Sequence, residues 1–178
     1  NTLRESGLII LCIALTILIA DQFTSSFCKP FFARFRPAQD PIIMYMVDVV
    51  DGYRGGRYGF VSSHAANTFG LALFISLLIK NKWMSISMFV WAILCSYSRI
   101  YLGVHYLGDI LGGMLFGLLT GFIIYIIYWY ISKRFTINKR NISSQYTSSG
   151  YAIADLNVFH TILYATYLVL IIRAVTII

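Results

Sequence analysis

A guanidinium, an imidazole and a carboxylate lie close together in the sequence, at a break between two very apolar segments. They belong to Arg99, His105 and Asp109. Ionisable side chains are costly in hydrocarbon, so such a cluster indicates function. With Gly103 interrupting the helix before His105, the four-residue spacing of His105 and Asp109 predicts that both lie on one helical face. Asp109 can then orient and polarise His105, which is the geometry of an imidazole acting as nucleophile or base.

Two further clusters supply groups that suit a phosphate. Lys29 and Arg36 are seven residues apart, and a helix that continues to the following proline would place both cations on roughly one side. Ser62 or Ser63 is well placed as the N-cap of the apolar segment that begins with His64. A helix start offers free amide N–H groups and a positive dipole end, and both attract phosphate. Together the three clusters indicate phosphate chemistry.

The clusters resemble the motifs of the type 2 phosphatidic acid phosphatase and vanadium haloperoxidase superfamily, which are K-x6-RP, PSGH and SR-x5-H-x3-D. The resemblance spans Lys29 to Asp109, and the first and third motifs match at every fixed position. The second departs twice, with Val61 where the family usually has Pro and Ser63 where it usually has Gly. The proline only pre-sets the turn into a helix. Glycine permits a close approach of backbone to phosphate, so the change at Ser63 bears on the amide contact there.

The resemblance implies a membrane lipid phosphatase, and it implies a role for each matching residue. His105 would be the nucleophile, Asp109 would position it, and His64 would protonate the leaving oxygen and then activate water. The groups implied to neutralise the transferring phosphoryl group are Lys29, Arg36, Ser62, Ser63 and Arg99. Three cations at the site, without clustered metal ligands, predict an enzyme that needs neither a metal ion nor a cofactor.

Composition places the chain in a bilayer independently of the motifs. Of its 178 residues 58% are hydrophobic and 12% are charged, whereas soluble domains carry about 25% charged residues. Mean hydropathy is +0.74. The segments long enough or nearly long enough to span are 7–27, 64–78, 83–97, 104–131 and 152–172. The sequence therefore predicts an all-α, polytopic transmembrane helical bundle with about five spans.

We expect a single transmembrane phosphatase domain over residues 1–178. Its core would span residues 7–132, followed by a basic connector at 133–151 and an extra C-terminal helix at 152–178. The chain begins at Asn1 rather than Met, and members of the superfamily commonly carry two helices before the segment that ends in K-x6-RP. One or two further spans are therefore expected upstream.

The order of the segments predicts a single active face. The three motifs fall at segment ends that lie on the same side of the membrane. The charges on the opposite side are Arg4, Lys80, Lys82, Lys133, Arg134, Lys139 and Arg140. With the phosphate-binding cations set aside, the positive-inside rule makes that side cytoplasmic. The predicted location is a bacterial inner membrane, with the active site on the periplasmic or external face.

Small residues predict how the site is held. Gly113, Gly117 and Gly121 continue the four-residue spacing of His105 and Asp109. One face of this segment would thus form a ridge, with His105 and Asp109 at its outer end and the glycines deeper in the membrane. Because such a ridge lets another helix approach closely, we expect the site to face the interior of the bundle.

The connection 38–60 is the longest on the motif face and carries Arg54 and Arg57 near its end. Loops over a site often carry selectivity, so these arginines are candidates for contact with a lipid headgroup. The alternative is an interfacial loop in which they pair with Asp48 and Asp51 or with bulk lipid. Both explanations stay open at this point.

The residues and the resemblance together predict an integral membrane phosphatase. It would hydrolyse a lipid-linked phosphate monoester or diphosphate through a phosphohistidine, and the candidate substrates are phosphatidic acid, phosphatidylglycerol phosphate, undecaprenyl diphosphate and a lipid A phosphate. Two alternatives remain, a lipid phosphotransferase with the same intermediate and a catalytically silent scaffold or transporter. The expected partners are the lipid substrate and membrane lipids. Nucleic acid is disfavoured because the basic residues are divided between the two faces and the site.

Overall fold

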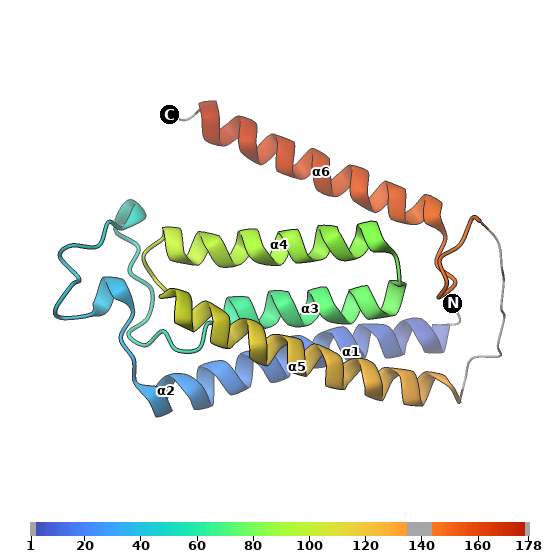
Figure 1. Cartoon of the computed structure of the whole chain (residues 1–178), viewed down its shortest axis with the longest axis horizontal. Helices are drawn as coiled ribbons and strands as arrows, with labels where there is room; N and C mark the ends of the chain where they lie inside the picture. The colour runs from blue at the N-terminus through green and yellow to red at the C-terminus, as the bar shows by residue number, and fades with distance from the viewer. Residues whose placement is uncertain (1–2, 135–143, 177–178) are drawn as a thin grey trace.

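The computed structural model describes residues 3–134 and 144–176, and the long elements there are helices (Figure 1). The first helix is built from α1 (Leu3–Gln22), a π-helical turn (Phe23–Cys28) and α2 (Lys29–Phe32). The others are α3 (Ser63–Ile79), α4 (Lys82–Tyr101), α5 (Leu107–Ser132) and α6 (Ile153–Thr176). Each of the five predicted apolar segments coincides with one of these helices, so the all-α prediction is confirmed.

Within residues 3–134 and 144–176, four helices are long and apolar enough to cross a membrane, namely Leu3–Phe32, Lys82–Tyr101, Leu107–Ser132 and Ile153–Arg173. Helix α3 is shorter, with 17 residues. At 1.5 Å per residue it extends about 26 Å, slightly less than a hydrocarbon core of about 30 Å. Much of α3 is covered by other helices rather than by lipid, because more than half of its side chains are buried or packed within the bundle.

Helix α3 lies at the centre of the bundle, against α1, α4 and α5 (Figure 1). Its closest partner is α5, and three glycines explain why. A Cβ atom added at Gly113, Gly117 or Gly121 would overlap a backbone carbonyl on the α3 side, and at Gly117 this is the carbonyl of Ala66. The backbones can touch only because these positions carry no side chain. The predicted small-residue ridge is therefore present, and α3 is the helix that packs on it.

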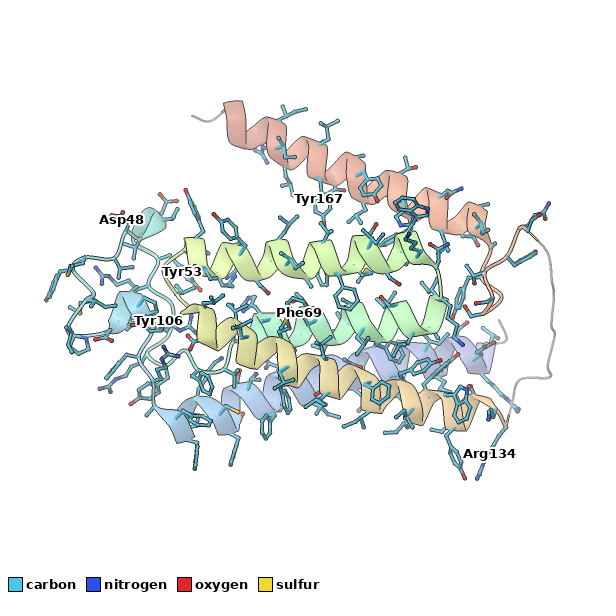
Figure 2. The ribbon with its side chains drawn as sticks, in the orientation of Figure 1. Asp48, Tyr53, Phe69, Tyr106, Arg134 and Tyr167 are labelled. Carbon is cyan, nitrogen blue, oxygen red and sulfur yellow. The ribbon has the colours of Figure 1, made fainter. Side chains whose placement is uncertain are left out.

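The loops that carry the motifs gather at one end of the bundle (Figure 1). The chain leaves α2 at this end, forms the loop 33–62 and enters α3, and it returns between α4 and α5 through residues 102–106. Figure 2 shows the same separation in the side chains, with Asp48 and Tyr106 at the loop end and Arg134 at the opposite end. The bundle thus brings segments distant in sequence to a common face.

Helix α6 stands apart from the other helices. It packs mainly on α4, where Ser87 Oγ lies 2.9 Å from Tyr164 Oη, and its Leu156 is buried in the core of the bundle. Beyond this contact α6 diverges from the bundle (Figure 1), and only 6% of its apolar window is buried. The predicted connector 133–151 lies in part outside the described residues, as do Lys139 and Arg140. The proposed domain boundaries there stay predictions.

Candidate active site

His105 and Asp109 are in contact, but not because they share a helical face. Helix α5 begins at Leu107, so His105 lies in the preceding turn and that prediction was wrong. The contact comes from helix capping. One Asp109 oxygen, Oδ2, accepts the backbone N–H of Tyr106 at 3.0 Å and lies 3.3 Å from His105 Nδ1. The first turn of a helix has unsatisfied amides, and an acidic residue three positions in can reach back to them.

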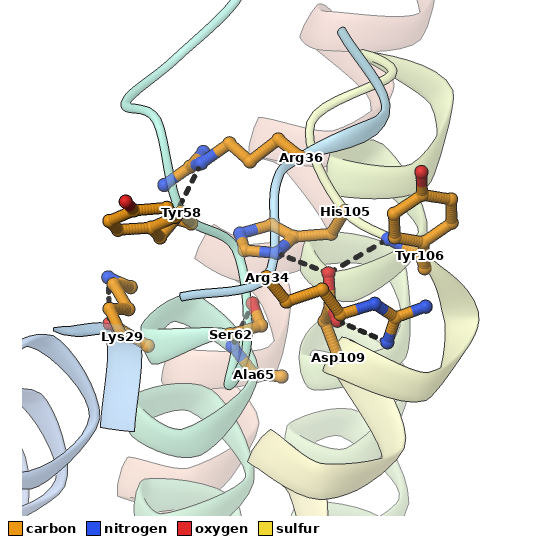
Figure 3. Close-up of polar contacts among 10 residues, drawn as sticks. Lys29, Arg34, Arg36, Tyr58, Ser62, Ala65, His105, Tyr106 and Asp109 are labelled. Atoms are coloured by element: carbon orange, nitrogen blue, oxygen red, sulfur yellow. Dashed lines mark hydrogen bonds and ion pairs between the residues drawn. The ribbon is translucent and has the colours of Figure 1, made fainter. Parts of the chain in front are cut away.

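The second Asp109 oxygen is held by a residue that the sequence interpretation missed. Arg34 Nη1 donates to Asp109 Oδ1 at 3.0 Å, and the guanidinium lies 4.4 Å from the centre of the Tyr106 ring (Figure 3). The Asp109 side chain is fully buried, whereas that of Arg34 is 44% exposed. The only feature of the sequence that could have pointed to Arg34 as a site residue is its position inside the K-x6-RP motif. Arg34 and His105 thus hold the two carboxylate oxygens of Asp109 from different segments.

Lys29 and Arg36 reach the site from different kinds of structure. The helix ends at Phe32 and Ala33 turns left-handed with φ 45°, so the condition for both cations to share one side, a helix that continues to the proline, is not met. The proline ring would clash with the carbonyl four residues earlier and forces the residue before it out of the helical region. Arg36 is accordingly extended, with φ −71° and ψ 154°.

The extended segment is held against the end of the 38–60 loop. Arg36 N–H donates to the Arg57 carbonyl at 3.2 Å, and Gly59 N–H donates to the Arg34 carbonyl at 2.9 Å. The Arg36 side chain donates through Nε to the Tyr58 carbonyl at 3.1 Å. A Cβ atom at Gly59 would lie 3.0 Å from Asp109 Oδ2. This close packing sets Arg36 beside the His105 and Asp109 pair.

Ser62 is the N-cap of α3, as one of the two sequence alternatives predicted. Its hydroxyl accepts the Ala65 N–H at 3.4 Å, and its own N–H donates to the Asp109 carbonyl at 3.0 Å. The start of α3 is thereby joined to the start of α5. Because Ser62 is fully buried, its side chain supports the helix start from behind the site.

Ser63, the position where the family usually has glycine, holds Lys29. Lys29 Nζ donates to Ser63 Oγ at 2.7 Å and to Ser25 Oγ at 3.1 Å. Ser25 Oγ and Thr24 Oγ1 each lie 2.9 Å from Ser63 Oγ. Thr24 and Ser25 belong to the π-helical turn, a local widening that often occurs at functional sites. The departure from the motif therefore adds a hydroxyl contact to the lysine.

The remaining predicted cations lie around this centre. Arg99 is in the last turn of α4, and its buried Nε has no hydrogen-bond partner among the described residues. Arg54 braces the loop by donating to the carbonyls of Ala38 at 2.8 Å and Met44 at 3.4 Å. Arg57 is exposed and lies over the rings of Phe35 and Tyr58. Within the described chain, neither loop arginine forms an ion pair with Asp48 or Asp51.

One cavity of about 330 Å³ brings most of the predicted residues together. It is lined by Asp21, Ser25, Lys29, Arg36, Ser63, His64, Asn67, Thr68 and His105. Five of these were predicted from the motifs, and Asp109 lies directly behind His105. Asp21, Ser25, Asn67 and Thr68 were not foreseen, since each stands outside the fixed motif positions. In the described residues no cluster of three or more His, Cys, Asp or Glu side chains could hold a metal ion.

The surroundings favour a neutral His105. Burial lowers the pKa of the imidazole below 6.5, the hydrogen bond with Asp109 partly opposes this, and the charge of Arg36 lowers it further. An ionised carboxylate only accepts hydrogen bonds, so Nδ1 carries the proton and Nε2 keeps a lone pair. Such an imidazole, with cations at hand, can attack a bound phosphate.

A family model described as the PAP2 superfamily matches residues 10–133. A lipid A 4'-phosphatase from Porphyromonas gingivalis is 45% identical over 74% of this chain, and one from Bacteroides thetaiotaomicron is 46% identical over 66%. The chain spans about half of these relatives, covering 56% and 53% of their lengths.

A solved structure has the same fold. It is the crystal structure of a transmembrane PAP2 type phosphatidylglycerolphosphate phosphatase from Bacillus subtilis, with a TM-score of 0.53 and 23% identity. The likeness covers 74% of this chain and 66% of that one. With four helices long enough to span, the shared fold is that of an integral membrane protein.

Proposed function

The chain belongs to the PAP2 superfamily, and we propose on this premise that it hydrolyses a lipid-linked phosphate monoester of the lipid A type through a phosphohistidine. The observation that carries the proposal is the convergence of His105, backed by Asp109, with His64, Lys29 and Arg36 on one cavity. The choice among lipid phosphates is supported by the two relatives named lipid A 4'-phosphatase.

In the first proposed step, Nε2 of His105 attacks phosphorus and the bond to the ester oxygen breaks. His64, at the start of α3 and on the same cavity, gives its proton to the leaving oxygen. In the second step a water attacks the phosphohistidine and His64 takes its proton. The N–P bond then breaks and inorganic phosphate leaves, which restores both imidazoles. Asp109 holds Nδ1 throughout and stabilises the charged ring.

The cations supply electrostatic stabilisation. Lys29 and Arg36 line the cavity, as do Ser63 and His64 at the start of α3, and Arg99 is close enough for its charge to act on His64 and Arg36. Three positive charges that do not have to rearrange during the reaction stabilise the equatorial oxygens of the transition state. The proposed reaction therefore proceeds without a metal ion.

The intermediate is testable by rapid quenching. Radiolabelled substrate mixed with the purified protein should leave label on His105 that is stable to alkali and labile to acid. His64→Ala should accumulate this label with a nitrophenyl phosphate, which needs no acid for its leaving group, because water attack is then slowed. His105→Ala should carry no label and release no phosphate. Near-normal phosphate release by His105→Ala would contradict the proposal.

Added acceptor alcohols separate hydrolysis from phosphotransfer. A hydrolase releases inorganic phosphate at the same yield with and without the acceptor, whereas a phosphotransferase forms a new phosphate ester. Release from no lipid phosphate at all would favour the silent scaffold.

The proposed location is a bacterial inner membrane with the site on the periplasmic face. Two of the charges assigned to the cytoplasm lie at the end opposite the site: Arg134 (Figure 2) and Lys80, which caps the end of α3 away from the loops (Figure 1). Single cysteines at the exposed positions Asp51 and Lys82 test this. A maleimide that cannot cross membranes should label the first in intact cells and the second only after lysis. The reverse pattern would overturn the orientation.

A further inference from the structure

The cavity at the site has two chemically different walls. Lys29 and Arg36, with the imidazoles of His64 and His105, form the wall that would hold the phosphate. Asp21, Ser25, Asn67 and Thr68 line the rest of the same space. A phosphate is attracted to the first wall and repelled by the carboxylate in the second. The second wall must therefore face another part of the substrate.

The second wall lies deeper in the membrane than the phosphate site. Asp21 precedes Lys29 by eight residues on a helix that runs toward the loop end, which is about 12 Å along the axis. Asn67 follows His64 by three residues on α3, which runs away from the loop end (Figure 1). Both Asp21 and Asn67 are therefore displaced from the phosphate site toward the middle of the membrane. In a bound lipid, this depth is occupied by the group that bears the phosphate.

The groups in this wall are mainly hydrogen-bond acceptors. Among the described residues the Asp21 carboxylate forms no ion pair, although its charge acts on nearby Lys29, and its hydrogen-bond contact is with Ser25 Oγ at 3.4 Å. The Asn67 side-chain oxygen is buried and has no hydrogen-bond partner in the described part of the chain. Thr68 Oγ1 already donates to the His64 carbonyl at 2.9 Å, so it too can only accept. Ionisable groups at membrane depth mark substrate sites, and unpartnered acceptors need donors.

We propose that Asp21 and Asn67 form a subsite for a leaving group that carries hydroxyl or amide N–H donors, as an acylated amino sugar does. The inference rests on the proposed phosphatase function and narrows its substrate. The diacylglycerol part of phosphatidic acid has no such donor beside its phosphate, and it would leave these acceptors unpaired. A site built to accept hydrogen bonds discriminates strongly against an analogue without donors.

The surface beyond Asp21 suits the acyl chains of the same substrate. Asp21 also lines a second, apolar cavity of about 540 Å³ on α1, with Leu11, Ala14, Leu15, Ile17 and Leu18. Cations, acceptors and apolar side chains thus follow one another along the bundle. An acylated amino-sugar phosphate presents an anion, donors and hydrocarbon in the same order.

The test compares two substrates of matched acyl length, an acylated glucosamine 4-phosphate and phosphatidic acid, with the full chain in detergent. Asp21→Asn and Asn67→Ala should each lower kcat/KM for the glucosamine lipid about tenfold, while kcat/KM for phosphatidic acid stays within about twofold. Ser26→Ala is the matched control, because Ser26 lies next to Ser25 in the π-helical turn but its exposed hydroxyl donates to Gln22 and not to Asp21. It should change neither rate.

A second experiment measures binding of the leaving group alone, so that its result does not depend on the rate of the chemical step. The dephosphorylated glucosamine lipid should inhibit the wild-type protein competitively and inhibit Asp21→Asn about tenfold more weakly. Equal losses on both substrates would show that Asp21 acts through Ser25 on Lys29, and unchanged rates would show no role. Either result overturns the subsite while the phosphatase function stands. Failure of the wild-type protein to release phosphate from both lipids would overturn the function and the subsite together.

Discussion

Helices α3 and α5 meet backbone to backbone, whereas α4 and α6 meet through a few side chains. In the first pair, the glycines of α5 lie against carbonyls of α3, and the starts of the two helices are joined by the Ser62 N–H bond to Asp109. In the second pair, a contact between Ser87 and Tyr164 is followed by divergence. The predicted site residues Ser62, Ser63, His64 and Asp109 all lie at the starts of the first pair. Close backbone contact positions the proposed chemistry, and α6 adds little to it.

The largest effect should come from filling the close contact. Gly117→Ala places a methyl group on the Ala66 carbonyl, so the helices must separate and the site must widen. We expect a lower Tm and loss of most phosphate release. Gly7→Ala is the matched control, because open space surrounds Gly7 in α1. An active Gly117→Ala protein with an unchanged Tm would show that the close contact is not what positions the site.

A smaller effect is expected from Arg34, which fixes Asp109 from the loop side. Arg34→Met frees one carboxylate oxygen, so Asp109 can rotate away from His105. We expect kcat to fall roughly 10- to 100-fold with little change in KM. Arg34→Lys should recover part of the rate because it keeps the charge. Arg134→Met is the control, since Arg134 also lies over a tyrosine ring, that of Tyr130, but at the far end. A rise in KM alone would instead place Arg34 in substrate binding.

The pH dependence of phosphate release tests whether burial at the start of α5 lowers the pKa of His105. The proposed nucleophile must be neutral, and its pKa is lowered, so activity is retained above that pKa and lost as pH falls through it. The acid limb of kcat/KM should therefore lie below 6.5, the ordinary pKa of His105. Asp109→Asn removes an influence that raises the pKa, so the limb of its residual activity should move lower still. A limb that moves upward would contradict this assignment.

The smallest effect is expected at α6. Tyr164→Phe removes the hydroxyl contact with Ser87 and should cost about 1 kcal/mol or less. Thermal melts should show a small decrease in Tm, and phosphate release should be unchanged. A large loss of activity would mean that α6 takes part in positioning the site, and the contrast between the two helix pairs would fail.

Local properties of the sequence were enough to predict the spans and most of the cavity. Hydropathy over about twenty residues determines whether a segment can cross a bilayer, and the five predicted segments coincide with helices. The motif positions identified five of the residues that line the cavity, namely Lys29, Arg36, Ser63, His64 and His105. The failures were also local. The helix that carries Lys29 ends at Phe32, before the proline that follows Arg36. Helix α5 begins at Leu107, so His105 lies outside it.

The sequence by itself determined which segments are apolar enough to enter the membrane and which residues are candidates for the proposed phosphate chemistry, because apolar length and motif spacing are local properties. Only the tertiary structure decided how these residues are held. Arg34 meets Asp109 across 75 positions of the chain, and Lys29 meets Ser63 across 34. Such contacts depend on the path of the loop and on how closely α5 approaches α3. The second wall of the cavity, with Asp21 and Asn67, arises in the same way. These two residues belong to no common motif, and they face one cavity only because α1 and α3 pack together.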